Sequence, residues 1–201
     1  MFKALLFDLG GVVISFDFQN AYAAIEAVCP HPAAEIPQRI RATGLLDKFE
    51  CGLLDPEEFF HQFSAALDLR ITFDQFRDIW SSIFLTHPLV PASLLARLRT
   101  RYRLIALSNT NALHFPLVRR SHPILDNFDA FVLSYEVKAM KPSPVIYQAA
   151  IATAGCRAEE CFFTDDIPAY VEAARTQGID AVQFISLQQL ESDLKSRRIL
   201  D

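Results

Sequence analysis

Short apolar runs that end in polar or turn residues recur along this chain of 201 residues. Such runs are typical of strands that are buried on both faces of a parallel sheet. We expect strands at residues 3–9, 104–107, 130–133, 161–164 and 181–184. Helical patterns lie between them, at residues 91–101, 113–120, 144–154 and 169–177. This alternation predicts an α/β fold with a Rossmann-like, doubly wound parallel sheet.

Residues from about 18 to 84 interrupt the alternation, because their apolar positions recur at helical spacing. Asp55 and Pro56 predict a helix start, with a capping side chain followed by proline in the first turn. Thr72 and Gln75 form a capping-box pattern for the next helix. Apolar residues at helical spacing include Ala24, Ile25, Val28, Phe59, Phe60, Phe63 and Leu67.

The helical block divides the chain into two predicted parts. Residues 16–85 form an inserted, small all-helical cap subdomain. Residues 1–15 and 86–201 form the Rossmann-like catalytic core, since the strand and helix patterns resume only after the block. Most of the 17 phenylalanines are expected to build cores, and Phe16, Asp17 and Phe18 are expected at the entrance between the two parts.

Composition narrows the classes of partner. Hydrophobic residues make up 51% of the chain and charged residues 21%, which is enough apolar surface for a core without staples. The formal net charge of −5 gives no electrostatic support to nucleic-acid binding. No apolar stretch approaches the roughly 20 residues that span a bilayer, so we expect no membrane partner.

The N-terminus and the cysteines indicate a compartment. The chain runs straight into the first predicted strand, so we expect no signal peptide. No Cys-x-x-Cys pair occurs among Cys29, Cys51, Cys156 and Cys161, so neither a zinc site nor a redox motif is favoured. Reduced thiols in a cytoplasmic protein are the expectation.

Aspartates follow two of the apolar runs. Asp8 leads into Gly10 and Gly11, and Asp165 and Asp166 follow the run at the other end of the chain. Sites in open α/β sheets form at the carboxyl ends of strands, so these carboxylates are expected in one crevice. Crowded carboxylates need a cation or a shared proton, and Mg²⁺ is the simplest cation for oxygen ligands. Taken singly, each aspartate is also explained as a turn or helix-capping residue.

Two further polar signals follow the strand pattern. Ser108 and Asn109 end the second core strand, where a hydroxyl and backbone donors can hold a phosphate oxygen or simply cap a loop. Lys141 precedes Pro142 just ahead of a helix. It can neutralise a phosphate or a carboxylate, or it can be a solvated lysine in a polar turn.

Together these motifs resemble the haloacid dehalogenase-like hydrolase superfamily. The resemblance rests on Phe-Asp-Leu-Gly-Gly-Val at 7–12, Leu-Ser-Asn-Thr at 107–110, Lys-Pro at 141–142 and Phe-Phe-Thr-Asp-Asp at 162–166. It extends to Phe-Glu-Cys-Gly-Leu-Leu at 49–54, which looks like that family's small helical cap. The subgroup it suggests contains small phosphatases of sugar phosphates and related epoxide-hydrolase N-terminal-like domains.

The resemblance implies a role for each motif. Asp8 is the expected nucleophile, which attacks phosphorus and forms an aspartyl-phosphate. Lys141 is expected to offset the negative charge of Asp8 and of the phosphate, and is the second catalytic residue. The phosphate-binding residues implied are Ser108, Asn109 and Lys141. The Mg²⁺ ligands implied are Asp8, the backbone carbonyl of Gly10, Asp165 and Asp166.

Three positions depart from the family pattern. Most family phosphatases carry a second aspartate two residues after the nucleophile, which protonates the leaving alcohol, and here that position is Gly10. General acid–base catalysis is worth about 10²–10⁴-fold, so its loss is expected to slow turnover of esters with poor leaving groups. Asp17 is the nearest spare carboxylate in the sequence. Tyr170 and Ile167 stand where polar residues are more usual near the metal.

These observations predict a Mg²⁺-dependent phosphatase acting on a small phosphorylated metabolite, with a sugar phosphate as one class. Gly10 and Tyr170 keep a second hypothesis open: a catalytically weak or inactive member that binds a metabolite or a protein. A haloacid dehalogenase is a third, less favoured hypothesis, because dehalogenases replace the late acids with uncharged residues, whereas this chain keeps Asp165 and Asp166. The chain is expected to be a monomer or a homodimer.

Overall fold

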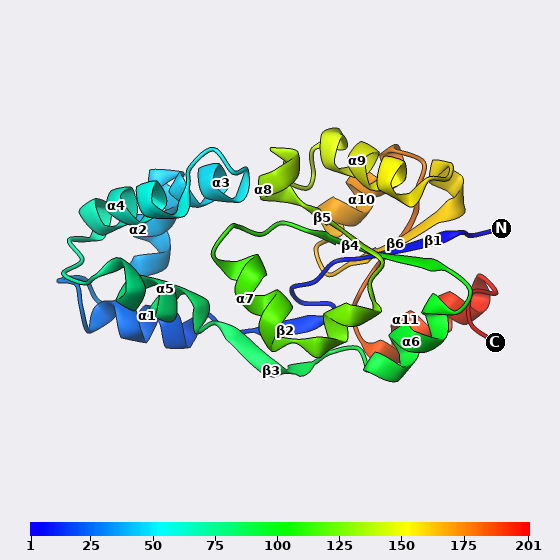
Figure 1. Ribbon diagram of the computed structural model, residues 1–201, viewed down its shortest axis with the longest axis horizontal. Helices are drawn as coiled ribbons and strands as arrows, with labels where there is room; N and C mark the ends of the chain where they lie inside the picture. Colours follow the sequence, from blue (N-terminus) through cyan, green and yellow to red (C-terminus); the bar gives the residue numbers. More distant parts are fainter.

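The computed structural model describes residues 1–201 apart from the side chain of Thr86. A five-stranded sheet forms the middle layer of the part that lies on the right in Figure 1. The strand order is β5-β4-β1-β6-β7, and every neighbouring pair is parallel. The strands are β1 (Ala4–Phe7), β4 (Arg103–Ser108), β5 (Ala130–Leu133), β6 (Cys161–Asp165) and β7 (Asp180–Gln183). The predicted doubly wound parallel sheet is therefore confirmed.

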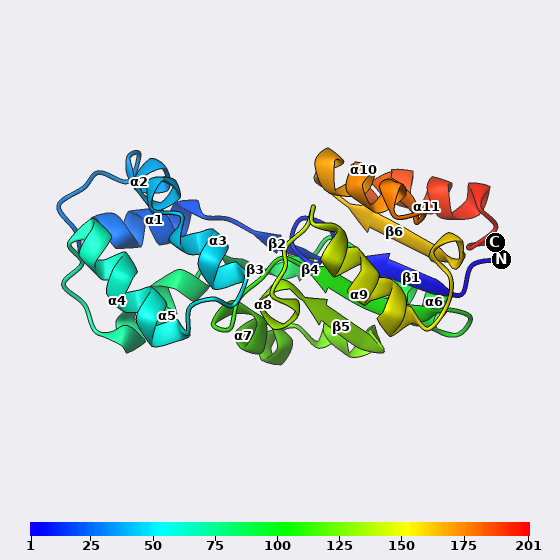
Figure 2. The same cartoon turned by 90° about the horizontal axis from the view of Figure 1, so that it is seen from above.

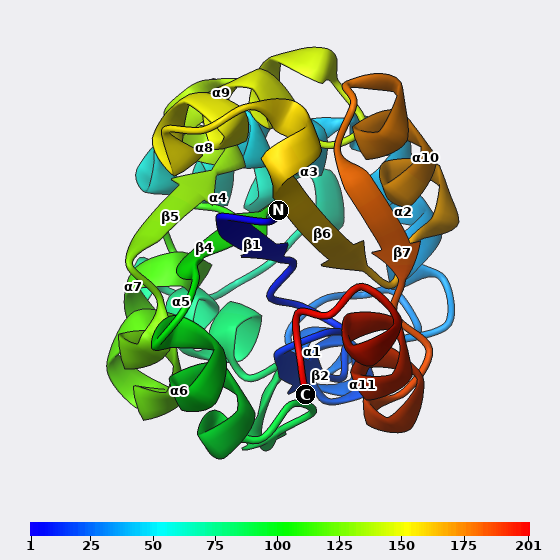
Figure 3. The ribbon, with the colours of Figure 1, turned by 90° about the vertical axis from the view of Figure 1, so that its right-hand side faces the viewer.

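Helices cover both faces of the sheet, which is why its strands read as continuous apolar runs (Figure 3). Leu5 and Phe7 of β1 face a cluster completed by helices α6 (Ala92–Arg99), α7 (His114–Ser121) and α11 (Leu187–Ser196). Ala4 and Leu6 face the opposite cluster, which α9 (Pro144–Ala154) and α10 (Pro168–Thr176) complete. Shorter turns are α8 (Ser134–Val137), η1 (Pro123–Asn127) and η2 (Ala158–Glu160).

Along the chain, five helices come between β2 and β3, and they extend away from the five-stranded sheet (Figure 2). They are α1 (Gln19–Glu26), α2 (Ile36–Thr43), α3 (Leu45–Glu50), α4 (Pro56–Leu67) and α5 (Phe73–Ser81). Asp55 accepts a hydrogen bond from the backbone of Glu58, and Thr72 forms the expected capping box with Gln75. Both predicted helix starts are therefore confirmed.

The helical block has its own core, which is rich in aromatic side chains. Phe59 stacks on Phe49 with ring centroids 4.1 Å apart, and Phe63, Phe76 and Trp80 pack around them. These rings lie in a cluster separate from the two that flank the sheet. The block can therefore hold its shape largely by its own packing.

The expectation of helix throughout residues 18–84 was too simple. Gly44 has a φ of +61° and separates α2 from α3, and strand β3 (Phe84–Pro88) begins where helix was expected. This strand pairs with β2 (Ile14–Phe16) in an antiparallel two-stranded sheet. A strand as short as β2 gives little periodic signal, so its pairing depends on tertiary contacts. The division of the chain at residues 15/16 and 85/86, which the paired strands span, stays a prediction.

Within the described residues, no helix combines the length and the apolar character required to cross a membrane.

Candidate active site

The carboxyl ends of the three central strands bring the predicted site residues together. Phe7 at the end of β1 lies opposite Ala106 of β4 and Thr164 of β6. Asp8 follows at once, and its backbone N–H donates to the carbonyl of Thr164 at 3.0 Å. The residues that follow β4 and those that end β6 therefore emerge beside Asp8, as the sequence pattern indicated.

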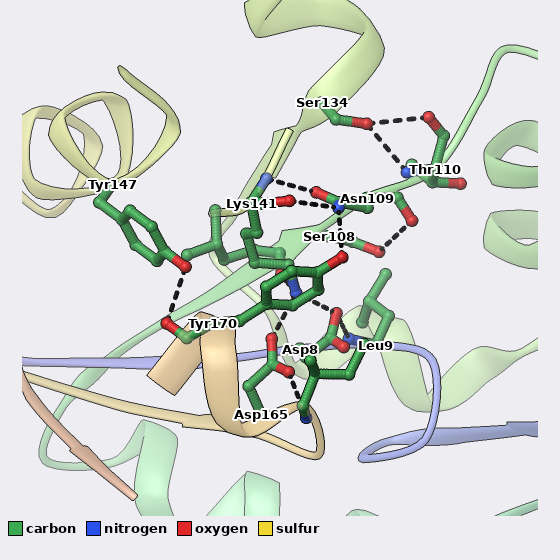
Figure 4. A network of polar contacts seen from close by, with 12 residues as sticks. Asp8, Leu9, Ser108, Asn109, Thr110, Ser134, Lys141, Tyr147, Asp165 and Tyr170 are labelled. Atoms are coloured by element: carbon green, nitrogen blue, oxygen red, sulfur yellow. Dashed lines mark hydrogen bonds and ion pairs between the residues drawn. The ribbon is translucent and has the colours of Figure 1, made fainter. Parts of the chain in front are cut away.

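A buried lysine lies at the centre of this cluster (Figure 4). The Nζ atom of Lys141 is 2.8 Å from Oδ1 of Asp8 and 2.6 Å from Oδ2 of Asp165. Its third hydrogen bond goes to the backbone carbonyl of Leu107 at 3.2 Å. Lys141 is 1% exposed, so the alternative of a solvated lysine in a polar turn is wrong. All three donors of the ammonium have acceptors, which fixes its position between the two carboxylates.

Burial and charge shift the proton affinities of these groups. Burial raises the pKa of Asp8 to about 7, against the lowering influence of Lys141, and the charge of Asp165 raises it further. Burial alone would lower the pKa of Lys141, but the carboxylates of Asp8 and Asp165 outweigh it and raise that pKa. Two acids share one ammonium, so the buried trio carries a net negative charge when all three are ionised. An added cation would relieve this charge.

The structure also brings a third carboxylate to the cluster. Asp8, Asp165 and Asp166 each offer an oxygen, and these oxygens lie within 4.8 Å of one another. A Cβ atom on Gly11 would lie 2.6 Å from Oδ2 of Asp166, so a glycine at that position makes room for the carboxylate. Clustered carboxylate oxygens are the ligands that Mg²⁺ prefers. The donor set therefore fits the predicted metal.

The three aspartates differ in their surroundings. Asp165 is fully buried, and its second oxygen accepts from the backbone N–H of Ile167 at 2.8 Å. Asp166 and Asp8 instead line a cavity of about 210 Å³, together with Gly10 and Lys141. Burial followed by the charge of Asp165 raises the pKa of Asp166. A ligand entering this cavity meets Asp8 and Asp166 before Asp165.

Asn109, which follows β4, forms hydrogen bonds with the backbone of the loop that carries Lys141. Its side-chain oxygen accepts from the backbone N–H of Lys141 at 2.8 Å, and its side-chain nitrogen donates to the Lys141 carbonyl at 3.0 Å. The same nitrogen lies 3.4 Å from the hydroxyl of Tyr170, whose ring centroid is 5.2 Å from Nζ of Lys141. Asn109 thus orients Lys141, and Tyr170 packs against the ammonium.

Ser108 lies on the other side of Asn109. Its hydroxyl donates weakly to the Asn109 carbonyl at 3.3 Å, and it lines a second cavity of about 150 Å³. Gly10 and Asn109 line both cavities. Most of the second cavity's wall is apolar, including Leu9, Ile14, Phe16, Phe18, Ile83, Phe84, Phe115 and Val118. The site therefore has a polar chamber at the carboxylates and an apolar chamber beside it.

Two residues of the site carried little signal in the sequence. Glu50 ends α3 and lines both cavities, but in the sequence it was only one letter of the cap motif. His114 of α7 is 6% exposed and links the core to the helical block, because its Nε2 lies 2.9 Å from the carbonyl oxygen of Trp80 in α5. Its pairing follows from the tertiary packing of α7 against α5, and a solitary histidine in a sequence does not reveal this.

The chain is similar to known proteins along most of its length. A family model described as haloacid dehalogenase-like hydrolase matches residues 2–178. The D-ribitol-5-phosphate phosphatase of Bacteroides thetaiotaomicron is 26% identical over 189 residues, which cover 91% of this chain and 92% of that protein.

Two solved structures share the fold along most of their length. A HAD family enzyme from B. thetaiotaomicron, in complex with magnesium and inorganic phosphate, has a TM-score of 0.83 at 29% identity. The superposition covers 92% of this chain and 96% of that one. A predicted HAD-like family hydrolase from Porphyromonas gingivalis has a TM-score of 0.84 at 26% identity, with both chains fully covered.

Proposed function

The chain belongs to the haloacid dehalogenase-like hydrolases, and from that premise we propose a Mg²⁺-dependent phosphatase that hydrolyses a small phosphorylated metabolite through a phosphorylated Asp8. The observation that carries the proposal is the ammonium of Lys141 held between Asp8 and Asp165, with Asp166 within reach of both carboxylates. A lysine and three carboxylates at the end of a parallel sheet suit the transfer of a phosphoryl group.

The core residues divide the chemistry between them. A carboxylate oxygen of Asp8 attacks phosphorus, the bond from phosphorus to the leaving oxygen breaks, and water later attacks the phosphorylated aspartate. Lys141 stabilises the negative charge on the phosphoryl oxygens. Asn109, which lines both chambers, and Ser108, at the wall of the apolar chamber, would hold that group only through their polar atoms and neighbouring backbone N–H groups. Mg²⁺ would be held by Asp8, Asp165, Asp166 and the carbonyl of Gly10, and it supplies neutralisation of phosphate charge.

The relatives narrow the class of substrate. The curated relative acts on D-ribitol 5-phosphate, and the crystallised HAD family enzyme holds magnesium and inorganic phosphate. Chambers of about 210 and 150 Å³ suit a monophosphate of a small metabolite. We therefore place sugar and polyol monophosphates first among the candidate substrates.

The alternatives receive less support from the same residues. A dehalogenase of this superfamily works without metal, so it would not require three carboxylates within 4.8 Å of one another. A module that only binds a ligand has no need for a buried lysine shared by two aspartates. Such a charge arrangement is costly to build and is more often retained for chemistry.

Phosphate release from a panel of sugar, polyol and acyl monophosphates tests the proposal, with Mg²⁺ and with EDTA. We expect turnover of one class with Mg²⁺ and none after chelation, with turnover restored by added Mg²⁺. Release that EDTA does not diminish would contradict the metal assignment. Absence of release from every compound, with well-folded protein, would favour the binding module instead.

A further inference from the structure

The place of the missing acid is occupied by an aromatic ring. A Cβ atom built on Gly10 would lie 2.9 Å from Cε1 and 3.3 Å from Cδ1 of Phe16. Phe16 lines both cavities and packs edge-on against Phe18, with the two ring centroids 5.5 Å apart. The ring therefore fills the space that a side chain at position 10 would use. A proton donor for the leaving group has to come from another element.

Asp17, the spare carboxylate nearest in sequence, is already engaged elsewhere. It is exposed, and its Oδ1 accepts from the backbone N–H of Gln19 at 2.9 Å, at the start of α1. Aspartates just before a helix often accept a hydrogen bond from its first backbone N–H groups, so capping of α1 explains the position of Asp17. Its geometry gives no reason to assign it to the leaving group.

Glu50 is placed where such a donor is needed. It ends α3 on the cap side and lines the chamber that holds Asp8, Lys141 and Asp166. It also lines the apolar chamber, together with Gly10 and Phe16. Glu50 therefore lies where the two chambers adjoin, between the carboxylate side and the apolar side.

A contact between the cap and the core fixes this end of α3. The Nζ atom of Lys138 donates to the carbonyl of Gly52 at 2.6 Å. Gly52 also lies so close to the carbonyl of Tyr135 that a Cβ atom there would be 2.1 Å from it. Glu50 is two residues away from this contact, so its position relative to the sheet is set by direct packing of the cap against α8.

The surroundings of Glu50 favour proton exchange near neutral pH. Burial raises its pKa to about 7, the charges of Asp47 and Asp8 raise it further, and Lys141 opposes them. Asp47 lies on the same helix. Asp8 influences Glu50 from the end of β1, Lys141 from the loop between α8 and α9, and Tyr170 from α10. A group that changes protonation near the working pH is suited to serve as both acid and base.

We propose that Glu50 is the general acid and general base of this enzyme, supplied by the cap in place of the residue absent at position 10. The assignment rests on the proposed phosphatase function. As Asp8 attacks phosphorus, the leaving oxygen departs with the bonding electron pair and takes the proton of the Glu50 carboxylic acid, which gives a free alcohol. The Glu50 carboxylate then removes a proton from water, water oxygen bonds to phosphorus, and Asp8 departs as a carboxylate.

The competing role for Glu50 is to hold a hydroxyl group of the substrate. The two roles differ in their response to the leaving group. A proton donor matters most when the leaving oxygen is strongly basic and little when it is a weak base. If the side chain only binds the substrate, its removal lowers kcat/KM by a factor that does not depend on the acidity of the leaving group.

The test compares wild type with Glu50→Gln on substituted phenyl phosphates, from dinitrophenyl phosphate to phenyl phosphate, whose phenol has a pKa of about 10. Because phenol release ends the first irreversible step, kcat/KM reports phosphorylation of Asp8. We expect kcat/KM to fall by about 10²-fold or more for phenyl phosphate and by less than about 10-fold for dinitrophenyl phosphate. With the activated ester, kcat should fall and a burst of about one equivalent of phenolate should appear.

Equal losses of kcat/KM along the series, or an unchanged kcat without a burst, would overturn the assignment. Glu57→Gln, an exposed glutamate of α4, is the matched control and should behave as wild type. Glu50→Asp keeps a carboxyl group, so its dependence on the leaving group should stay shallow even where turnover drops. Failure of wild type to release phosphate from any ester would instead contradict the proposed function.

Discussion

On the sheet side of the active site, the ammonium of Lys141 lies between two carboxylates and donates to a backbone carbonyl. On the cap side, Glu50 borders a chamber with mostly apolar walls. The sheet side is a tightly paired electrostatic centre, whereas the cap side offers one ionisable group in a setting that favours its neutral form. In the proposed mechanism, the sheet side transfers the phosphoryl group and the cap side protonates the leaving group.

The two sides are also held by different structure. Asp8 follows β1 and Asp165 ends β6, and the side chains of both strands are buried on both faces, so the main core fixes the backbones of these aspartates. Glu50 ends a helix of a block with its own aromatic cluster, and this block contacts the core near Glu50 through the hydrogen bond between Gly52 and Lys138. Damage to the sheet side should therefore affect every substrate, and damage to the cap side should depend on the leaving group.

Among these variants, Asp8→Asn should lose the most turnover. An amide is a poor nucleophile, so we expect turnover of all phosphate esters, activated aryl esters included, to fall on the order of 10⁴-fold or more. Phosphate release with Mg²⁺ measures the loss, and Asp68→Asn is the control, since Asp68 is exposed on the cap with a φ of +51° that asparagine tolerates. Residual turnover close to wild type would remove Asp8 as the nucleophile.

Lys141→Met should damage both activity and stability. It leaves Asp8 and Asp165 buried without their cation, and breaking a buried pair costs about 3 kcal/mol or more. We expect a lower free energy of unfolding in urea together with a loss of turnover on every ester. Lys195→Met, an exposed lysine of α11, should change neither quantity. Unchanged stability would show that the trio is not a structural centre.

Protonation of His114 at low pH should weaken the contact between the cap and the core. Burial lowers its pKa from 6.5 to about 4, against the hydrogen bond to the Trp80 carbonyl, so the folded state holds it neutral. Asn111 presents its side-chain nitrogen to Nδ1 at 3.2 Å, which disfavours a proton there. The stabilisation is present above pH 6.5 and is lost progressively as pH falls to about 4, by about 3 kcal/mol in total.

Urea unfolding at pH 7 and at pH 4.5 measures this loss. His114→Gln should lose less stability between the two values than wild type, because the amide does not titrate. His61→Gln, an exposed histidine of α4, should follow wild type. Identical losses in wild type and His114→Gln would place the acid sensitivity in other groups.

The smallest effect is expected from Gly52→Ala. The added Cβ would strike the Tyr135 carbonyl, so the end of α3 must move away from the core and displace Glu50. We expect kcat/KM for phenyl phosphate to fall about 10-fold, with little change for dinitrophenyl phosphate. Gly44→Ala is a matched control, since Gly44 also has a positive φ in the cap but has no atom within 4 Å of its Cβ position. Equal kinetics of the two variants would contradict this contact's role.

Strong local patterns carried much of the prediction. The apolar runs before Asp8 and Asp165 matched β1 and β6, and the strand and helix predicted at residues 130–133 and 144–154 have the same bounds as β5 and α9. Helix α11 and strands β2 and β3 were not predicted. Short strands have too few positions for a period, and β2 and β3 pair across a long insertion, so their formation depends on contacts distant in sequence.

Local patterns were enough to predict the parallel sheet and the carboxylates at its strand ends, because the apolar side chains that signal a strand also bury it and the turn residues mark where it stops. Three arrangements became visible in the folded chain: Lys141 buried between Asp8 and Asp165, Phe16 in the space beside Gly10, and Glu50 at the wall of the site. These arrangements join segments far apart in the chain, and local patterns carry no information on which side chains will meet.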